Sequence, residues 1–371
     1  MIYFDHAATT SLSPTALQRM IEIAQATYGN PSSIHQAGRK ANQVLRQARQ
    51  DIANTLSALP HQIIFTSGGS EANNLAIKGY ALSHQAKGKH LITTAIEHHS
   101  VLHTMQYLEE RFGFEVTYIQ PINQIITAQQ IKEALRADTI LVSTMFANNE
   151  TGQILPIKDI GDVLVEHQAV FHVDAVQTIG KVKINPKELG IDFLSASGHK
   201  FHGPKGVGFL YSNVNQFDTL IHGGKQEQQL RAGTENLPAI SAMAVALKKQ
   251  IEQLDKTNEY ITTLRNQLLS QLDNLTFYIN QSEEQLPHIL NIGFPNKLNE
   301  QLLMQLDLAG IAVSSGSACT AGAIQQSHVL EAMYGKSSHR LKESIRISIS
   351  ETNTHEEVMT LAKELKTIIG G

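Results

Sequence analysis

Short apolar runs alternate with amphipathic helical patterns through residues 62–211, and this alternation limits the possible folds more than any other feature. The runs are rich in β-branched and aromatic residues, which is typical of buried strands. Strands alternating with helices predict an α/β fold with a mostly parallel sheet covered by helices on both faces. Such a sheet binds ligands at the carboxyl ends of its strands. The predicted strands are 62–67, 90–95, 115–119, 139–146, 169–175, 192–197 and 207–211, and the predicted helices are 71–83, 100–111, 128–135 and 157–167.

The pattern changes after residue 237. One apolar stripe predicts a single long helix over residues 237–272, and a helix of this length is expected to bridge two domains. Shorter strands mixed with helices follow it. We therefore expect a large domain at residues 15–254 and a smaller α/β domain formed by residues 1–14 and 255–371.

Composition excludes several classes of protein. A chain with 42% apolar and 17% charged residues can bury a large core. A formal net charge of -4 argues against a direct nucleic-acid partner. No secretion signal and no run of about 18 apolar residues is seen, so we expect a cytoplasmic protein that does not enter a membrane.

Lys200 follows a predicted strand that ends in small residues, within the segment SASGHKFHGPKG. Glycines in this segment allow a flat ligand to approach the backbone closely. A lysine amine in an enclosed pocket loses its proton readily and can form a Schiff base with an aldehyde cofactor. A solvent-exposed loop lysine is the commoner interpretation for lysine alone.

Asp174 ends another apolar strand, in FHVDAVQ. A buried carboxylate is costly without a cation, and a pyridinium nitrogen is such a cation. Gln177 lies three residues on, which places it on the same face if a helix follows. The alternative for Asp174 is a structural N-cap of that helix.

Two further strand ends carry polar groups. TSGGSEANN runs from strand to helix through Gly69 and Ser70, and backbone amides at a helix N-terminus can bind phosphate, although a tight turn explains the glycines equally well. AIEHHSV places His98 where it could stack on a cofactor ring or serve a structural role. An amine, a carboxylate, a phosphate site and an imidazole are together what pyridoxal phosphate requires.

Cys319 is the only cysteine in the chain, within SSGSACTAG. It therefore cannot form an internal disulfide or a structural zinc site with several thiolates. Gly316 and Gly322 flank it, which is consistent with a mobile loop. A free cysteine is most often a small buried residue, but serine and glycine neighbours favour a reactive thiol.

Nine segments occur here in the order and at the spacing found in cysteine desulfurases, so the chain resembles the NifS/IscS group of that family within the aminotransferase class V superfamily. They are DHAATT, GNPSSIH, TSGGSEANN, EHHSV, NNETG, HVDAVQ, SGHKFHGPKGVG, RAGTEN and SSGSACTAG. The resemblance covers essentially the whole chain. It implies the type I fold of pyridoxal-phosphate transferases.

The same resemblance implies roles for individual residues. Lys200 would bind the cofactor aldehyde and move protons, Asp174 would keep the ring nitrogen protonated, and His98 would stack on the ring and exchange protons with the reacting thiol. The ring hydroxyl and phosphate would be bound by Gln177, Gly69, Ser70, Ser197 and His199, with Thr234 reaching across from the second subunit of a homodimer. The substrate would be bound by Asn149, Arg346 and Asn30.

The implied reaction removes sulfur from L-cysteine, with pyridoxal 5'-phosphate as cofactor, and gives L-alanine and a persulfide on Cys319. The persulfide sulfur would pass to an iron-sulfur scaffold protein or a tRNA-thiolating enzyme. Two other activities of the same fold stay open, a class V aminotransferase and a selenocysteine lyase. A non-catalytic docking protein is a third alternative, against which the presence of Lys200, Asp174 and Cys319 together argues.

Overall fold

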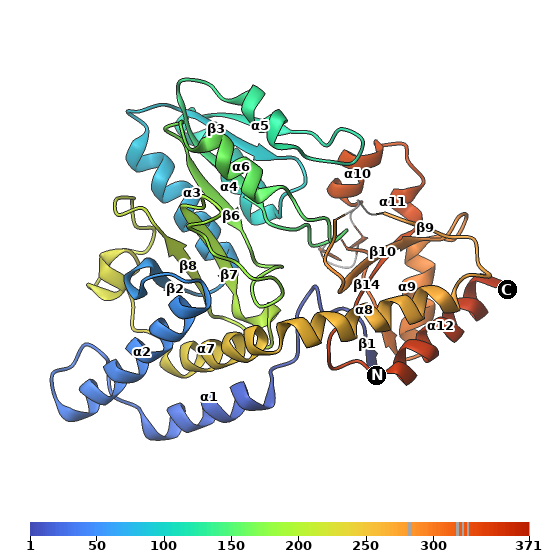
Figure 1. The fold of residues 1–371 in the computed structure, drawn as a ribbon, viewed down its shortest axis with the longest axis horizontal. Helices are drawn as coiled ribbons and strands as arrows, with labels where there is room; N and C mark the ends of the chain where they lie inside the picture. Colours follow the sequence, from blue (N-terminus) through green and yellow to red (C-terminus); the bar gives the residue numbers. More distant parts are fainter. Residues whose placement is uncertain (281–283, 317–318, 321–322, 325, 371) are drawn as a thin grey trace.

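A seven-stranded sheet in the order β2-β8-β7-β6-β5-β3-β4 forms the centre of the larger part of the chain (Figure 1). The structure is a computed structural model that describes residues 1–280, 284–316, 319–320, 323–324 and 326–370. β8 is antiparallel to both of its neighbours, whereas the other neighbouring pairs are parallel, so the predicted mostly parallel sheet is confirmed. The strands are β2 (Ile63–Thr66), β3 (His90–Thr94), β4 (Glu115–Ile119), β5 (Thr139–Met145), β6 (Val170–Asp174), β7 (Phe193–Ser197) and β8 (Gly208–Ser212).

Helices cover both faces of this sheet. On one face α3 and α4 pack on the sheet, and on the other α1, α2, α5, α6 and α7 contribute to a larger buried cluster. Neighbouring strand residues divide between the two clusters, as Phe193 and Leu194 do, because successive side chains of a strand point to opposite faces. The helices are α1 (Pro14–Ala26), α2 (Gln36–Thr55), α3 (Gly69–His84), α4 (His99–Phe112), α5 (Ala128–Ala134), α6 (Ile157–Leu164) and α7 (Leu237–Glu252).

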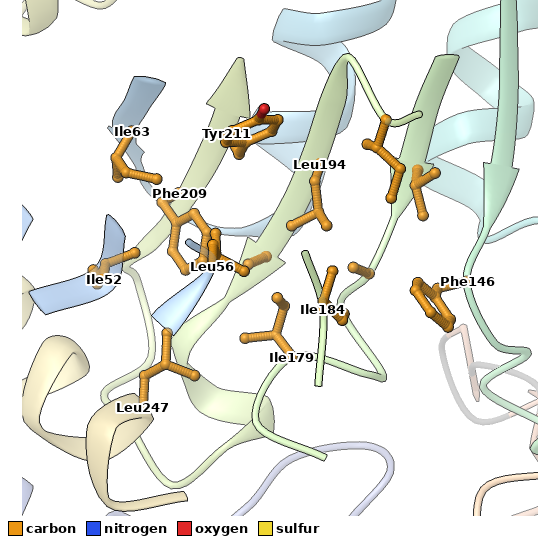
Figure 2. Close-up of a cluster of buried hydrophobic side chains, with 14 of the residues drawn as sticks. Ile52, Leu56, Ile63, Phe146, Ile179, Ile184, Leu194, Phe209, Tyr211 and Leu247 are labelled. Atoms are coloured by element: carbon orange, nitrogen blue, oxygen red, sulfur yellow. The ribbon is translucent and has the colours of Figure 1, made fainter. Parts of the chain in front are cut away.

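Figure 2 shows part of the larger cluster, where Ile52 of α2 and Leu247 of α7 lie close to Phe209 of β8. Phe209 is fully buried, and removing such a ring typically costs about 3–5 kcal/mol of stability. This packing makes the strands a rigid base, so side chains at their carboxyl ends are held in fixed relative positions.

A second, smaller group of elements packs around its own apolar cluster. Its antiparallel sheet has the order β14-β10-β9 (Figure 1). β1 near the N-terminus pairs in parallel with β11. The elements are α8 (Leu254–Gln271), β9 (Tyr278–Ile279), β10 (Ile289–Gly293), α9 (Asn299–Leu308), β11 (Ile311–Ala312), β14 (Ser344–Ser348) and α12 (His355–Gly370), with β1 (Ile2–Tyr3) joining from the start of the chain. Between β11 and β14 lie β12 (Cys319–Thr320), β13 (Ala323–Ile324), α10 (His328–Tyr334) and α11 (Arg340–Glu343).

The prediction of one continuous helix over residues 237–272 is wrong. α7 ends at Glu252 and α8 begins at Leu254, with Gln253 between them at φ -108° and ψ 6°. Apolar periodicity continues across a one-residue interruption of this kind, and no glycine or proline marks it in the sequence. Within the described part of the chain, no helix has both the length and the apolar character needed to cross a membrane.

Candidate active site

A cavity of about 790 Å³ lies at the carboxyl ends of the parallel strands, where the fold type predicts a ligand site. Its walls come from the large sheet, from the segment that follows β1 and from β14. Ten residues predicted from the sequence line it together: Gly69, Ser70, His98, Asn149, Asp174, Gln177, Ser197, His199, Lys200 and Arg346.

Lys200 ends a short 3-10 helix that directly follows β7. Its Nζ donates hydrogen bonds to the carbonyl oxygens of Ala7 at 2.5 Å and Ala8 at 2.9 Å. Burial, and then the positive charges of Arg346 and Lys181, lower the pKa of Lys200 to about 7. Its amine can therefore lose a proton near neutral pH, as attack on an aldehyde requires.

Asp174 and His98 are linked through Asn73 and Ser100. Asn73 Nδ2 donates to Asp174 Oδ2 at 2.7 Å and to Ser100 Oγ at 2.9 Å. The Ser100 amide donates to His98 Nδ1 at 3.1 Å, so the proton of the neutral imidazole lies on Nε2. Enclosure by the cavity walls lowers the pKa of His98, which keeps the ring neutral and suited to stacking.

Asp174 has no cationic partner among the residues that the structure describes, although it is buried. Its second oxygen, Oδ1, accepts the Val176 N–H at 3.0 Å. All of its described partners are thus neutral donors, and a carboxylate held in this way stabilises a cation placed in the cavity.

No helix follows Asp174 in the described structure, where a turn follows β6, so the alternative interpretation of Asp174 as a helix N-cap is wrong. Gln177 still reaches the cavity through this turn. Its Nε2 donates to the Ala7 carbonyl at 2.9 Å, while its buried Oε1 has no described partner. A buried acceptor without a donor is costly, so this oxygen fits a ligand hydroxyl.

The N-terminus of α3 faces the cavity at Gly69 and Ser70. A Cβ on Gly69 would lie 2.6 Å from Val176 Cγ2, which explains why glycine is needed there. The first amides of a helix have no partner within it and bind anions well. Nearby, His199 Nδ1 lies 3.1 Å from Thr9 Oγ1, and burial lowers the pKa of His199 to about 4, so it is neutral.

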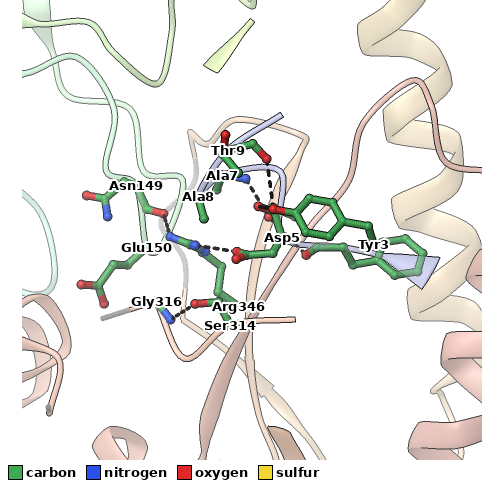
Figure 3. Close-up of polar contacts among 12 residues, drawn as sticks. Tyr3, Asp5, Ala7, Ala8, Thr9, Asn149, Glu150, Ser314, Gly316 and Arg346 are labelled. Atoms are coloured by element: carbon green, nitrogen blue, oxygen red, sulfur yellow. Dashed lines mark hydrogen bonds and ion pairs between the residues drawn. The ribbon is translucent and has the colours of Figure 1, made fainter. Parts of the chain in front are cut away.

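Arg346 of β14 enters the cavity from the smaller group of elements, as Figure 3 shows. Its guanidinium donates to Asp5 Oδ1 and to the Asn149 carbonyl, each at 2.8 Å. Its buried Nε has no described partner. A forked cation of this kind is suited to bind a carboxylate.

Comparison with known proteins identifies the family. The aminotransferase class-V family matches residues 2–361. The chain is 48% identical to the putative cysteine desulfurase IscS 1 of Bacillus subtilis, over 99% of this chain and 98% of that protein. It is 44% identical to the cysteine desulfurase IscS of Dictyoglomus turgidum, over 90% of this chain and 85% of that one. The chain belongs to the cysteine desulfurase family.

Solved structures agree with this assignment. A NifS-like protein superposes with a TM-score of 0.93 at 38% identity, covering 100% of this chain and 99% of that one. A structure described as SspA in complex with cysteine has a TM-score of 0.85 at 38% identity, covering 95% and 100%. The family and the fold class predicted from the sequence are therefore confirmed.

Three residues predicted for a cysteine desulfurase site are not placed in the cavity. Asn30 accepts the Ser32 amide in an exposed turn, and Thr234 is exposed in this single chain. Cys319 is in β12, paired with Ile324 of β13, but its side chain lies outside the described residues. The predicted mobility of its loop falls on residues that the structure does not describe. All three roles stay predictions.

Several residues that line the cavity or bind its side chains were not predicted from the sequence. Asn73 lies within the quoted segment TSGGSEANN, one turn after Gly69, and that spacing was an available signal. The sequence holds no signal for the carbonyl groups of Ala7 and Ala8, because every residue type has a backbone carbonyl. Glu150 follows Asn149 in NNETG and was given no role.

Proposed function

We propose that this protein is a cysteine desulfurase that uses pyridoxal 5'-phosphate. The observation that carries the proposal is the grouping of Lys200, Asp174, His98 and the α3 N-terminus around one cavity, with Arg346 at its side. The relatives named above as cysteine desulfurases support it.

The cavity residues fit the cofactor. When bound, pyridoxal 5'-phosphate supplies an aldehyde that bonds to amines and a ring that withdraws electrons from the substrate's Cα. Asp174 would hold the ring nitrogen protonated, Gln177 Oε1 would accept the ring hydroxyl, and His98 would stack on the ring. The phosphate would be bound by Gly69, Ser70, Ser197 and His199, with Thr234 of a second subunit.

Substrate positioning and proton transfer follow from the remaining groups. Arg346 and Asn149 would hold the substrate carboxylate, with Asn30 nearby. Lys200, whose pKa is about 7, would take the Cα proton in its neutral form and return it as an ammonium. His98 carries its proton on Nε2 and would exchange it with the reacting sulfur.

Sulfur transfer would occur on Cys319. The thiol gives up its proton, its sulfur bonds to the sulfur of L-cysteine, and the substrate's C–S bond breaks. The carbon that loses sulfur gains a proton, so the products are L-alanine and a persulfide, and no outside oxidant or reductant is needed. An acceptor, either an iron-sulfur scaffold protein or a tRNA-thiolating enzyme, would then take the sulfur.

We further propose that the protein is a cytoplasmic homodimer with a large domain at residues 15–254 and a small one at 1–14 and 255–371. β1 pairs with β11, which supports grouping the first residues with the last part of the chain. The exposed position of Thr234 supports a site completed by a second subunit.

The experiment that tests the activity is incubation with pyridoxal 5'-phosphate and L-cysteine, followed by intact-mass measurement and an assay for alanine. We expect the mass of one added sulfur on wild type and none on Cys319→Ser, which should also release little alanine. A Cys319→Ser variant with full turnover would instead favour a class V aminotransferase, and preferential turnover of selenocysteine a selenocysteine lyase. Failure to bind the cofactor would favour a docking protein.

A further inference from the structure

Glu150 is a buried acidic residue beside the cavity that the reaction above does not use. Its amide donates to Asn148 Oδ1 at 2.9 Å, and its carbonyl accepts from Asn291 Nδ2 of β10 at 3.1 Å. The backbone of Glu150 is thus held by two hydrogen bonds, one to Asn148 in the segment after β5 and one to Asn291 in the smaller sheet.

The carboxyl group of Glu150 contacts two places that are distant from it in the sequence. Ser327 Oγ donates to Glu150 Oε2 at 2.5 Å. A Cβ on Gly316 would lie 3.1 Å from the same oxygen, so the Gly316 backbone lies directly against the carboxyl. Burial raises the pKa of Glu150, and the hydrogen bond from Ser327 opposes that rise.

Gly316 and Ser327 stand on either side of Cys319 in the sequence. Ser327 also accepts the Leu330 amide at 3.0 Å and so caps α10, which fixes the C-terminal end of the stretch that carries Cys319. At the N-terminal end of this stretch, the backbone of Ser314 pairs with the backbone of Arg346 through hydrogen bonds of 3.1 Å and 2.6 Å. Figure 3 shows Ser314, Gly316 and Glu150 close to the Arg346 guanidinium.

We propose that Glu150 is a positioning residue for Cys319, because its carboxyl accepts a hydrogen bond from Ser327 at one end of the stretch that carries the thiol and lies against Gly316 at the other. The inference rests on the proposed function and adds a residue to it. Glu150 directly follows Asn149, whose carbonyl binds Arg346. The proposed substrate carboxylate site, at Asn149 and Arg346, and the residue that positions the Cys319 stretch, Glu150, therefore lie on one short turn. This turn relates the position of the stretch to that of the substrate carboxylate.

Two substitutions separate this role from general support of the fold. Glu150→Gln replaces the carboxyl group by an uncharged amide of the same shape, and Ser327→Ala removes the hydroxyl and keeps the carboxyl group. Glu343→Gln is the matched control, because Glu343 is also buried and accepts from Tyr278 Oη at 3.0 Å, away from the cavity.

The first measurement compares two reactions of each holoenzyme. Exchange of the Cα hydrogen of L-alanine with solvent deuterium needs Lys200 and the cofactor but no thiol, whereas sulfur gain needs Cys319. We expect Glu150→Gln and Ser327→Ala to slow sulfur gain about tenfold while exchange changes less than about twofold, as a change of about 1.4 kcal/mol confined to one step would produce. The double variant should be no slower than the slower single variant, since both act on one contact, which Glu150→Gln weakens to a neutral hydrogen bond and Ser327→Ala removes. Equal slowing of both reactions, or unchanged sulfur gain, would overturn the inference.

The second measurement uses protein without substrate, so that it stands even if sulfur transfer does not occur. We expect iodoacetamide to alkylate Cys319 at least about threefold faster in both variants than in wild type and Glu343→Gln. Loss of the negative charge alone would accelerate only Glu150→Gln. Unchanged alkylation of Ser327→Ala therefore refutes the role of Glu150, whereas a wild type that gains no sulfur refutes the proposed function instead.

Discussion

The Lys200 amine should titrate near neutral pH, and this can be measured before any turnover. A lysine with the ordinary pKa of 10.5 has about one amine in 3,000 deprotonated at pH 7, whereas a pKa of about 7 leaves about half in that form. At pH 7 Lys200 should therefore react with an aldehyde about a thousandfold faster than an exposed lysine of equal nucleophilicity.

The assay follows reaction of the cofactor-free protein with pyridoxal 5'-phosphate between about pH 5 and pH 10. Borohydride traps the product, and peptide mass spectrometry compares Lys200 with Lys158, whose side chain is 53% exposed. Labelling of Lys200 should rise with pH and reach a plateau above its midpoint near 7. A midpoint near 10 would refute the argument that burial and neighbouring charge set this pKa.

A variant tests the cause of the shift. Arg346→Met removes the positive charge that ranks after burial among the causes, and it leaves Asp5 without its ion-pair partner. Both effects stabilise the ammonium, so the labelling midpoint of Lys200 should move to higher pH. A midpoint that stays constant or falls would contradict this assignment.

Two further predictions concern the segment that precedes Thr234. Glu227→Gln should lower the free energy of unfolding by about 3 kcal/mol in urea titrations, because Glu227 is a buried acceptor of two hydrogen bonds from Arg49 at 2.6 and 2.7 Å and one from the Phe65 amide at 2.8 Å. Lys158→Ala, which breaks an exposed ion pair with Asp162, should cost less than about 0.5 kcal/mol, and equal effects would show that burial does not matter here. Gln229→Gly should raise the melting temperature and stabilise by up to about 1 kcal/mol, since Gln229 has φ 71°, and a lower melting temperature would contradict strain at this position.

The central sheet was predictable because six of its seven strands are buried along all or nearly all of their length and are bounded by clear turn or helix signals, whereas the edge strand β4 is only partly buried. The polar residues near the ends of these strands were predictable as well, since Asp174 ends one predicted strand and Lys200 lies three residues after the end of another. Ligand chemistry concentrates at that edge of a parallel sheet, so residue type and position were both informative there.

The contacts between distant segments were not predictable in the same way. Glu150 and Ser327 are 177 positions apart, and neither shows in its own neighbourhood that it meets the other. The alanines that bind Lys200 act only through their carbonyl groups. The break at Gln253 depends on where two groups of elements meet, which local periodicity does not report.

The segment after β1 has a consequence for the order of assembly during synthesis. Asp5 bonds to Arg346 and the Ala7 amide to Ser348, each pair 341 positions apart. The N-terminal residues are synthesised first, but their partners are synthesised near the end. These contacts, and the pocket wall that they form, can therefore be completed only after nearly the whole polypeptide has been translated. An incomplete product would therefore lack an ordered lysine pocket, which keeps unfinished chains from binding an aldehyde productively.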